Sequence, residues 1–342
     1  MPVISETTKE SYKMFENVLS NVLSNVDWSK LKSSERANIL KDYKTVIKAF
    51  KTYTIKDSHG KDTGKHYQKS TLRNYFTKLH VLIMKHPRWE LIEADKAYVE
   101  EMNILNKELT EQAGENEKTA TQLKNWVDWE LVLKLRDELK KDISTSSDAT
   151  KWKAYQKWML LSLYVLRPPV RMDYQDMRII SHVEPKLSSD YNYIAMKDKV
   201  FVFNQYKTSK FHKKKNKKYT RSTEILQNTK PIPDELFNII KIWIKDYKPN
   251  TTSFDKDGNL YNVLLVQSDG SPLCGPALTK MITRLFTDRD YPGASVDILR
   301  HSYIVHEFDA GHLDTTNKQK QLASDMMHSV LMQSEYYKKP SK

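Results

Sequence analysis

A polar segment, QAGENEKTATQ (112–122), divides the sequence into two parts, because it carries no apolar periodicity and cannot contribute a stripe to a hydrophobic core. The chain has 342 residues, enough for two domains of ordinary size. Apolar residues make up 39% of it, which indicates folded domains rather than disorder. We therefore predict one domain over 1–115, a linker over 116–124 and a second domain over 125–342.

The first part is predicted to be helical. Its apolar residues recur at steps of three and four, the spacing of one face of a helix. A third helix is predicted over 90–109. The segment KDSHGKDTGKH (56–66) contains two glycines and is predicted to be a loop between the first two helices. The two stripes are Leu40, Tyr43, Val46, Ile47 and Phe50, then Leu72, Tyr75, Phe76, Leu79 and Leu82.

The second part mixes helices with a few strands. An apolar-rich helix is predicted over 151–166, and the Pro168-Pro169 pair must end it, since proline lacks a donor and clashes with the preceding turn. Residues 191–206 are rich in Tyr, Ile, Val and Phe around Lys197-Asp198, which predicts a β-hairpin. Helices resume from residue 233, with a short irregular or β segment near 261–273. The fold class is therefore mainly α with a small β-sheet (α+β).

Charge and apolar content limit the class of partner. The formal charge is +13 and the pI is near 9.3, which favours a polyanionic partner, nucleic acid or an anionic membrane, over a neutral small molecule. The longest strongly apolar run, 158–166, is nine residues, against the ~20 that a membrane-spanning helix needs. The N-terminus has no apolar signal core, and the single cysteine, Cys274, excludes an internal disulfide. We expect a soluble intracellular protein, in the nucleus if the host is eukaryotic or viral and otherwise in the cytoplasm.

The positive charge is concentrated in one segment. Residues 197–221 hold ten lysines and arginines and one acid, a local charge of +9. Because this run continues from the predicted hairpin, we expect it to be displayed against DNA, with an affinity that falls steeply with salt. A nuclear-import signal in HKKKNKK is the alternative. The candidate DNA-binding residues are Lys210, Lys213, Lys214, Lys215, Lys217 and Lys218.

Five further residues have the chemistry needed for a tyrosine to attack a phosphodiester. A free phenol has a pKa of ~10, so its phenolate costs ~4 kcal/mol at pH 7. The phosphate also repels an anion, so cations must neutralise its non-bridging oxygens, and the forked guanidinium suits this role. The leaving oxygen needs a proton, which a lysine can donate. In chain order the candidates are Arg171, Lys207, Arg300, His328 and Tyr337.

This set resembles the tyrosine recombinase (phage-integrase) superfamily over about residues 120–342. That family has a first arginine, a hairpin lysine, a His-x-x-Arg pair, a His or Trp, and a nucleophilic tyrosine in this order. The tyrosine typically follows the His or Trp by nine residues, as Tyr337 follows His328 here. The resemblance implies a catalytic domain of this fold, preceded by a helical core-binding domain that closes on DNA.

The resemblance also implies a role for each position. Arg171 and Arg300 would hold the scissile phosphate, and Lys207 would be the general acid toward the leaving 5′ hydroxyl. His328 would donate a hydrogen bond to a phosphate oxygen, and Tyr337 would form a 3′-phosphotyrosyl bond. One position departs from the pattern, because Asp297 stands three residues before Arg300, where the family usually has His or Lys.

Several assignments have rivals in the sequence. Arg167 competes with Arg171, Lys210 with Lys207, and Tyr336 with Tyr337. Either Asp173 or Asp176 is expected to support the first arginine, and His301 to pack beside Arg300 rather than enter the chemistry. His328 must lie at or before the start of the tyrosine-bearing helix, because nine residues are 2.5 helical turns and would place the two side chains on opposite faces.

The expected function is therefore that of a site-specific DNA recombinase or integrase. It would need no metal and no cofactor, since a transesterification retains the phosphate bond energy in the phosphotyrosine. The expected partners are double-stranded DNA and three further copies of the chain, as a homotetramer on two DNA sites, without a membrane. The alternatives are a type IB topoisomerase-like enzyme that relaxes DNA as a monomer and a DNA-binding protein whose catalysis is impaired by Asp297.

Overall fold

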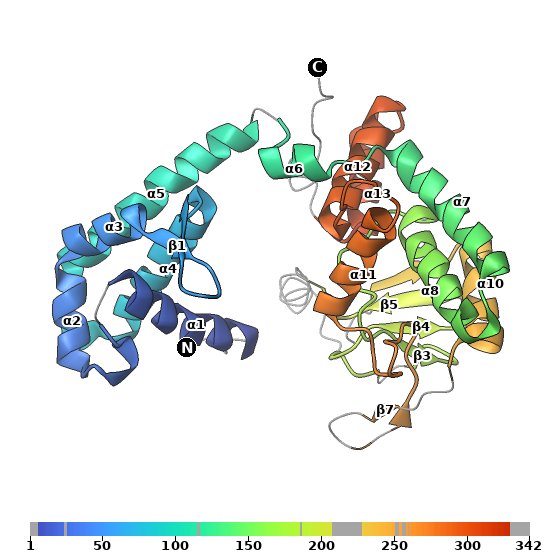
Figure 1. The fold of residues 1–342 in the computed structure, drawn as a ribbon, viewed down its shortest axis with the longest axis horizontal. Coiled ribbons are helices and arrows are strands. Elements are labelled where there is room, and N and C mark those ends of the chain that lie inside the picture. Colours follow the sequence, from blue (N-terminus) through green and yellow to red (C-terminus); the bar gives the residue numbers. More distant parts are fainter. Residues whose placement is uncertain are drawn as a thin grey trace. The chain divides into compact units, whose positions relative to one another are not determined.

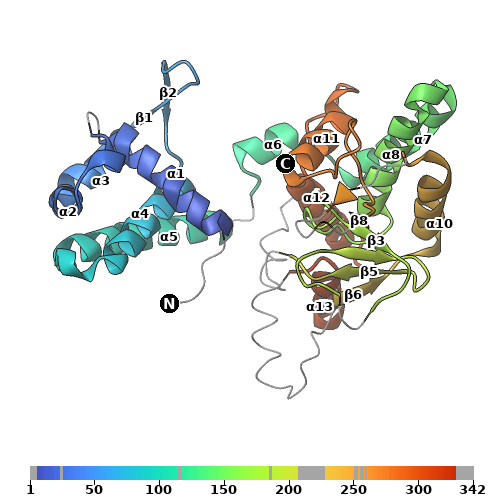
Figure 2. The same cartoon turned by 90° about the horizontal axis from the view of Figure 1, so that it is seen from below.

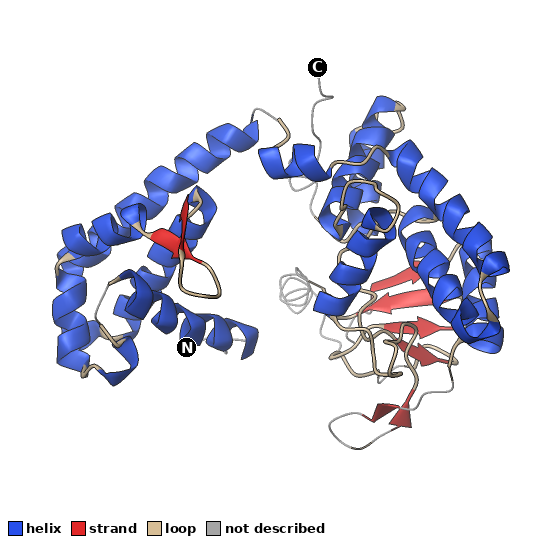
Figure 3. Cartoon of the chain, viewed as in Figure 1, coloured by secondary structure: helices blue, strands red, loops and turns tan. Residues whose placement is uncertain are grey.

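The computed structural model describes residues 6–23, 26–114, 117–184, 187–206, 228–249, 253–254, 258 and 260–328. The chain forms two compact units, Met1–Glu115 and Asn116–Lys342, and its elements follow one another in the colour order of Figure 1. Helices dominate both units and strands are few and short (Figure 3). The predicted fold class, mainly α with a small β-sheet, is confirmed.

The first unit is built from helices around a core of aromatic and aliphatic side chains. The predicted stripe over 40–50 is divided between two helices, because Asp42 leaves the helical conformation and its carboxylate accepts the backbone N–H of Thr45. Tyr98 donates to the Leu40 carbonyl at 3.0 Å inside this core. The helices are α1 (Glu6–Val22), η1 (Trp28–Lys30), α2 (Ser33–Lys41), α3 (Tyr43–Thr52), α4 (Lys69–Lys85), η2 (Pro87–Trp89) and α5 (Ile92–Gly114).

The segment 56–66, predicted to be a loop, is mostly an antiparallel ribbon. Strands β1 (Thr54–Lys56) and β2 (Asp62–His66) pair with Thr54 opposite His66 and Lys56 opposite Asp62. The loop prediction was wrong because Gly60 and Gly64 adopt positive φ angles of 78° and 68°, which a tight turn and a strand irregularity require. The two glycines therefore shape a hairpin instead of interrupting structure.

The second unit begins with a short helix, α6 (Ala120–Asn125), inside the segment predicted as a linker. Thr119 and Gln122 form a capping box, which stabilises the helix start without any apolar stripe. The predicted helix over 151–166 is confirmed as α8, which ends at Val165 before the proline pair. The helices of this unit after α6 are α7 (Trp129–Thr145), α8 (Asp148–Val165), α10 (Asp234–Ile242), η3 (Trp243–Tyr247), α11 (Gly275–Thr287), α12 (Val296–Asp309) and α13 (Thr316–Asp325).

A four-stranded sheet packs against these helices, in the order β3-β4-β5-β6. The predicted hairpin is confirmed as β4–β5, with Tyr193 opposite Val202. Strands β3 and β4 run parallel, and the other neighbours are antiparallel. The strands are β3 (Arg178–Ile180), β4 (Tyr193–Ala195), β5 (Val200–Phe203) and β6 (Asn228–Pro231), and a separate pair consists of β7 (Ser253–Phe254) and β8 (Leu260–Tyr261).

Helix α8 lies at the centre of the second unit's core. Nine of its residues are buried, including Trp158 and Tyr164, and they pack with Phe201 and Phe203 of the sheet. The side chain of Gln156 is also buried and satisfies both backbone polar groups of Val266. Its Nε2 donates to the Val266 carbonyl and its Oε1 accepts the Val266 N–H, both at 2.9 Å. Within the described residues, none of the helices combines the length and the apolar content needed to cross a membrane.

Candidate active site

The loop that follows α8 holds the first predicted arginine. Tyr164 of α8 donates to the carbonyl of Arg171 at 3.0 Å, and the backbone N–H of Arg171 donates to Oδ2 of Asp173 at the same distance. Both bonds fix the backbone of the loop. The Arg171 side chain is half-buried, so the fold holds this cation at the boundary between the core and solvent.

Arg300, the second predicted arginine, is fully buried on α12. Its Nη1 donates to the carbonyl of Pro169 at 3.2 Å and to the carbonyl of Met326 at 3.3 Å. One guanidinium therefore joins the loop after α8 to the end of α13. These two segments are more than 150 residues apart in the sequence, and Arg300 brings them to one place.

Asp173 supplies the negative charge that a buried guanidinium needs. Its carboxylate is 7% exposed. Burial raises its pKa to about 6, while Arg300, Arg171 and Arg167 act in the opposite direction. Of the two acids expected to support the first arginine, Asp173 has this position. Asp176 instead lies beside Arg178 and Tyr261, on the side of β3. Among the described residues, the Asp173 carboxylate lies near three guanidiniums, a local excess of positive charge.

A pH titration of stability should detect Asp173. Its pKa is raised from 3.8 to about 6 in the folded chain, so between these pH values the folded state holds a proton that the unfolded state releases. The free energy of unfolding should therefore fall as pH rises through this window, by up to about 3 kcal/mol. Urea unfolding at several pH values measures this fall, which Asp173→Asn should remove.

The control for this titration is Asp198→Asn. The Asp198 carboxylate accepts the backbone N–H of Val183, and its pKa is lowered, so its own contribution has the opposite sign. The fall between pH 4 and pH 6 should persist in this variant. Parallel curves for wild type and Asp173→Asn would contradict the assignment to Asp173.

His328 reaches the same region from the end of α13. The helix ends at Asp325, Met327 has a positive φ of 57°, and the backbone N–H of His328 donates to the carbonyl of Ala323 at 3.0 Å. The imidazole is 8% exposed. His328 thus lies beyond α13 and two residues after Met326, whose carbonyl accepts from Arg300.

Two cations that sequence reasoning did not select also hold the end of α13. Arg167, the rival of Arg171, is buried over the rings of Phe201 and Phe203 and donates to the carbonyl of Asp325 at 3.4 Å. Lys230 of β6 lies 3.1 Å from both Ser324 Oγ and Asp325 Oδ1. Because helix C-termini carry partial negative charge, these cations fix the turn that leads to His328.

Loss of the Lys230 contact should measurably destabilise the chain. The Lys230 side chain is 12% exposed and that of Asp325 is 29% exposed, so Lys230→Met leaves a partly buried carboxylate without its cation. We expect the free energy of unfolding in urea to fall by about 1–3 kcal/mol. The matched control is Lys199→Met, since Lys199, just before β5, and Asp234 of α10 form an exposed pair, where a change below about 1 kcal/mol is expected. Equal losses in both variants would contradict a special role for Lys230.

Asp297, at the position that departs from the family pattern, has a different environment from Arg300. Its side chain is 58% exposed in the first turn of α12, where a negative charge is favourable. One ionisable neighbour is His301, whose Nε2 lies 3.5 Å from Asp297 Oδ2. His301 is buried, as expected, and its Nε2 also lies 3.3 Å from Gln122 Nε2 of α6.

Asn192 joins the arginine loop to the strand that leads into the basic segment. Its Nδ2 donates to the carbonyls of Asp173 and Gln205, and its Oδ1 accepts the backbone N–H groups of Asn204 and Gln205, all at 2.8–2.9 Å. It is buried. No sequence signal distinguishes this asparagine from the chain's other asparagines, because its role depends on contacts across the fold.

The remaining predicted residues lie outside the described part of the chain. They are Lys207, Lys210, Lys213, Lys214, Lys215, Lys217, Lys218, Tyr336 and Tyr337. Their assignments remain predictions. Among the described residues, no group of three or more His, Cys, Asp or Glu side chains could hold a metal ion.

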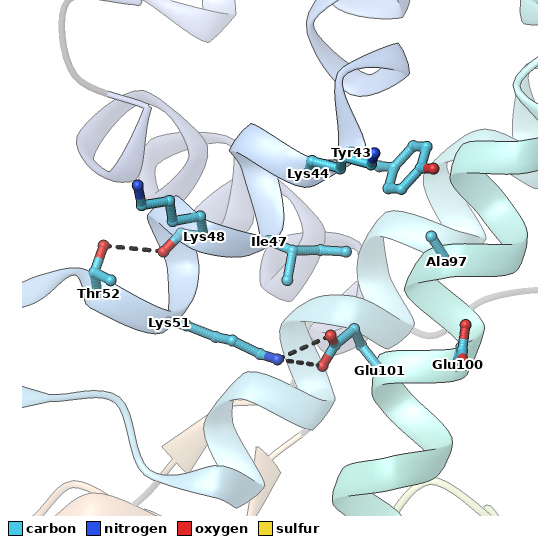
Figure 4. Close-up of a pocket in the computed structure, with 9 residues that line it drawn as sticks. All are labelled: Tyr43, Lys44, Ile47, Lys48, Lys51, Thr52, Ala97, Glu100 and Glu101. Atoms are coloured by element: carbon cyan, nitrogen blue, oxygen red, sulfur yellow. Dashed lines mark hydrogen bonds and ion pairs between the residues drawn. The ribbon is translucent and has the colours of Figure 1, made fainter.

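A separate hollow lies in the first unit between α3 and α5 (Figure 4). It encloses about 500 Å³. Lys51 lies across it and pairs with Glu101 at 2.7 Å. Because lysines and glutamates share the lining, the hollow has no strong preference for an anion. Its lining residues are Tyr43, Lys44, Ile47, Lys48, Lys51, Thr52, Ala97, Glu100 and Glu101.

No protein-family model and no curated protein matches the sequence. Among solved structures, the chain is similar to the Tn1549 transposon integrase in complex with circular intermediate DNA, with 12% identity, 96% of this chain and 95% of that chain covered, and a TM-score of 0.43. A complex of a variant of that integrase with transposon right end DNA has 13% identity, the same coverage and a TM-score of 0.42. Because these sequence identities and TM-scores are low, the functional inference depends on the chain's own residues.

Proposed function

We propose that this chain is a tyrosine recombinase that cuts and rejoins DNA through a covalent 3′-phosphotyrosyl bond. The proposal rests on one observation: Arg300 connects three segments that are distant in the sequence, in a region with a local excess of positive charge among the described residues. Arg171 and Asp173 come from the loop after α8, Arg300 from α12, and the turn to His328 from α13. We assign the guanidiniums of Arg171 and Arg300 and the imidazole of His328 to one phosphate, because such donors suit its growing negative charge.

In the proposed reaction, Tyr337 releases its phenolic proton to solvent, its Oη attacks the scissile phosphorus, and the bond to the 5′ oxygen breaks. Lys207 gives its proton to that leaving oxygen, while Arg171, Arg300 and His328 hold the non-bridging oxygens. A 5′ hydroxyl of a partner duplex then attacks the phosphotyrosine and releases the phenol. No metal or cofactor takes part, since one phosphodiester is exchanged for another. Strand exchange between two sites calls for four copies of the chain.

A second candidate is a DNA-binding protein with impaired catalysis, which one observation favours. Asp297 is a carboxylate at a position where the family usually has a cation, and its side chain is largely exposed. A carboxylate can accept the phenol proton but repels the phosphate. A type IB topoisomerase-like enzyme would share the bond chemistry and act as a monomer.

A nicked suicide duplex tests the proposal. Because of the nick, the fragment that carries the new 5′ hydroxyl is short and diffuses away after cleavage. The protein therefore stays joined to the 3′ phosphate of the remaining strand. The duplexes should come from a library of candidate target sites, and the expected result is a protein–DNA adduct that survives denaturing electrophoresis. DNA binding without an adduct on any duplex would overturn the proposal in favour of the non-catalytic candidate. Relaxation of supercoiled DNA by monomers would favour the topoisomerase-like one.

A further inference from the structure

The β1–β2 ribbon of the first unit contributes little to any core. Residues 56–66 are eleven consecutive exposed residues, and in Figure 2 the ribbon projects beyond the helices of its unit. Side chains in this position add almost nothing to stability through burial. Because the ribbon is ordered but does not contribute to the core, it is a candidate for binding another molecule.

The ribbon's conformation is determined by its own hydrogen bonds. The Asp57 carboxylate accepts the backbone N–H groups of His59 and Lys61, both at 2.9 Å. The Asp62 carboxylate accepts the N–H of Gly64 at 2.8 Å. Both acids of the ribbon are therefore committed to its turns. One oxygen of each carboxylate is thus held by the backbone of the ribbon.

The base of the ribbon is held by an aromatic cluster. Tyr53 and Tyr67, which flank the two strands, stack with ring centroids 5.4 Å apart, and Tyr67 meets Tyr75 of α4 edge-on at 5.0 Å. Burial raises the pKa of the Tyr67 phenol above its usual range. The ribbon is thus fixed to α3 and α4, so less ordering entropy is lost when it binds a ligand.

Three lysines give the ribbon its outward chemistry. Lys56, Lys61 and Lys65 are exposed. Across the part of the chain that the structure describes, no acidic side chain forms an ion pair with any of them. A lysine on a long flexible stem is a mobile cation that suits phosphates. The ribbon therefore presents ammonium groups on a narrow, pre-ordered backbone.

We propose that the β1–β2 ribbon is a contact element for double-stranded DNA. The ribbon would lie in the major groove, with Lys56, Lys61 and Lys65 on the flanking phosphates. Two paired strands lie about 4.8 Å apart, and the major groove, about 12 Å wide, admits such a ribbon. The identity of the partner as DNA rests on the proposed function. The ribbon itself adds a contact beyond the catalytic site and the 197–221 segment.

The test measures how the affinity of the full chain for DNA depends on salt. The probe is a labelled mixed-sequence duplex of about 40 base pairs, roughly four helical turns. In Lys56→Gln/Lys61→Gln/Lys65→Gln, the slope of log K against log salt should be smaller by up to about 2.7, for three lost phosphate contacts. Equivalently, between 50 and 200 mM salt, wild-type affinity should fall up to about 40-fold more than that of the variant.

Two further variants make the result specific. Lys41→Gln/Lys44→Gln/Lys48→Gln removes the same charge from exposed positions on α2 and α3 of the same unit, and its slope should stay near that of wild type. Replacement of the three ribbon lysines by arginine should also retain the wild-type slope. An unchanged slope in the ribbon glutamine variant, or an equal fall in the helix control, overturns the proposal. Thermal melting of each variant checks that the unit remains folded.

Failure of this proposal is distinguishable from failure of the proposed function. The same variants can be incubated with the suicide duplex at saturating DNA concentration. If the ribbon only binds, the glutamine variant should form adduct at the wild-type rate once saturated. If no variant and no wild-type chain forms an adduct, the catalytic proposal fails, while the salt slopes still decide whether the ribbon contacts DNA.

Discussion

Tyr337→Phe is expected to abolish the covalent adduct on the suicide duplex while DNA affinity stays within about twofold of wild type. The variant lacks only the phenolic oxygen, so nothing can attack the phosphorus, whereas the cations that attract DNA remain. Denaturing electrophoresis of the reaction with labelled DNA measures the adduct, and fluorescence anisotropy measures the binding. Among single substitutions, this one has the largest expected effect, because it removes an atom of the bond that forms.

The matched control is the neighbouring phenol. The sequence predicts a helix for the tyrosine segment, and adjacent residues of a helix point about 100° apart, so only one of Tyr336 and Tyr337 is expected to face the phosphate. Tyr336→Phe should therefore retain the adduct at close to the wild-type rate. Adduct formation by Tyr337→Phe, or its loss in Tyr336→Phe alone, would transfer the nucleophile to Tyr336. Loss in both single variants with weakened DNA binding would instead indicate a structural role for the pair.

Arg300→Lys should slow adduct formation by about a hundred- to a thousand-fold, the range found when a preorganised donor to a developing charge is removed. Lysine keeps the positive charge but not the fork, so it cannot contact a phosphate oxygen and also donate to the carbonyls of Pro169 and Met326. The rate with the suicide duplex at saturating DNA measures the chemical step separately from binding.

The same substitution should lower stability, because Arg300 is fully buried. Imperfect replacement leaves the buried carbonyls of Pro169 and Met326 short of a donor, a defect worth about 1–3 kcal/mol for each buried group. Urea unfolding must therefore confirm that the Arg300→Lys chain is folded before its rate of adduct formation is compared with that of wild type.

Arg289→Lys is the control for a partly buried, ion-paired arginine outside the site. Arg289 pairs with Asp142 and Glu138 of α7, so its substitution should affect stability with little effect on the rate. A folded Arg300→Lys chain with wild-type adduct formation would exclude Arg300 from the chemistry.

Local patterns in the sequence were sufficient for much of the fold. The proline pair ends α8 where expected, since the steric restriction of proline does not depend on the rest of the molecule. The alternation of residues around Lys197 and Asp198 correctly predicts β4–β5. The same local logic was wrong at 56–66, because two glycines are compatible with a loop and equally with a ribbon that needs positive φ.

The sequence by itself determined many of the secondary-structure elements, the basic segment and the chemical identity of the candidate residues, because these depend on residue type and short spacing. Only the tertiary structure decided that Asp173, and not Asp176, lies among the arginines, and that Arg167 and Lys230 hold the end of α13. Contacts between residues more than ninety positions apart leave no periodic trace in the sequence. The raised pKa of Asp173 likewise comes from desolvation, which exists only after the chain has folded around it.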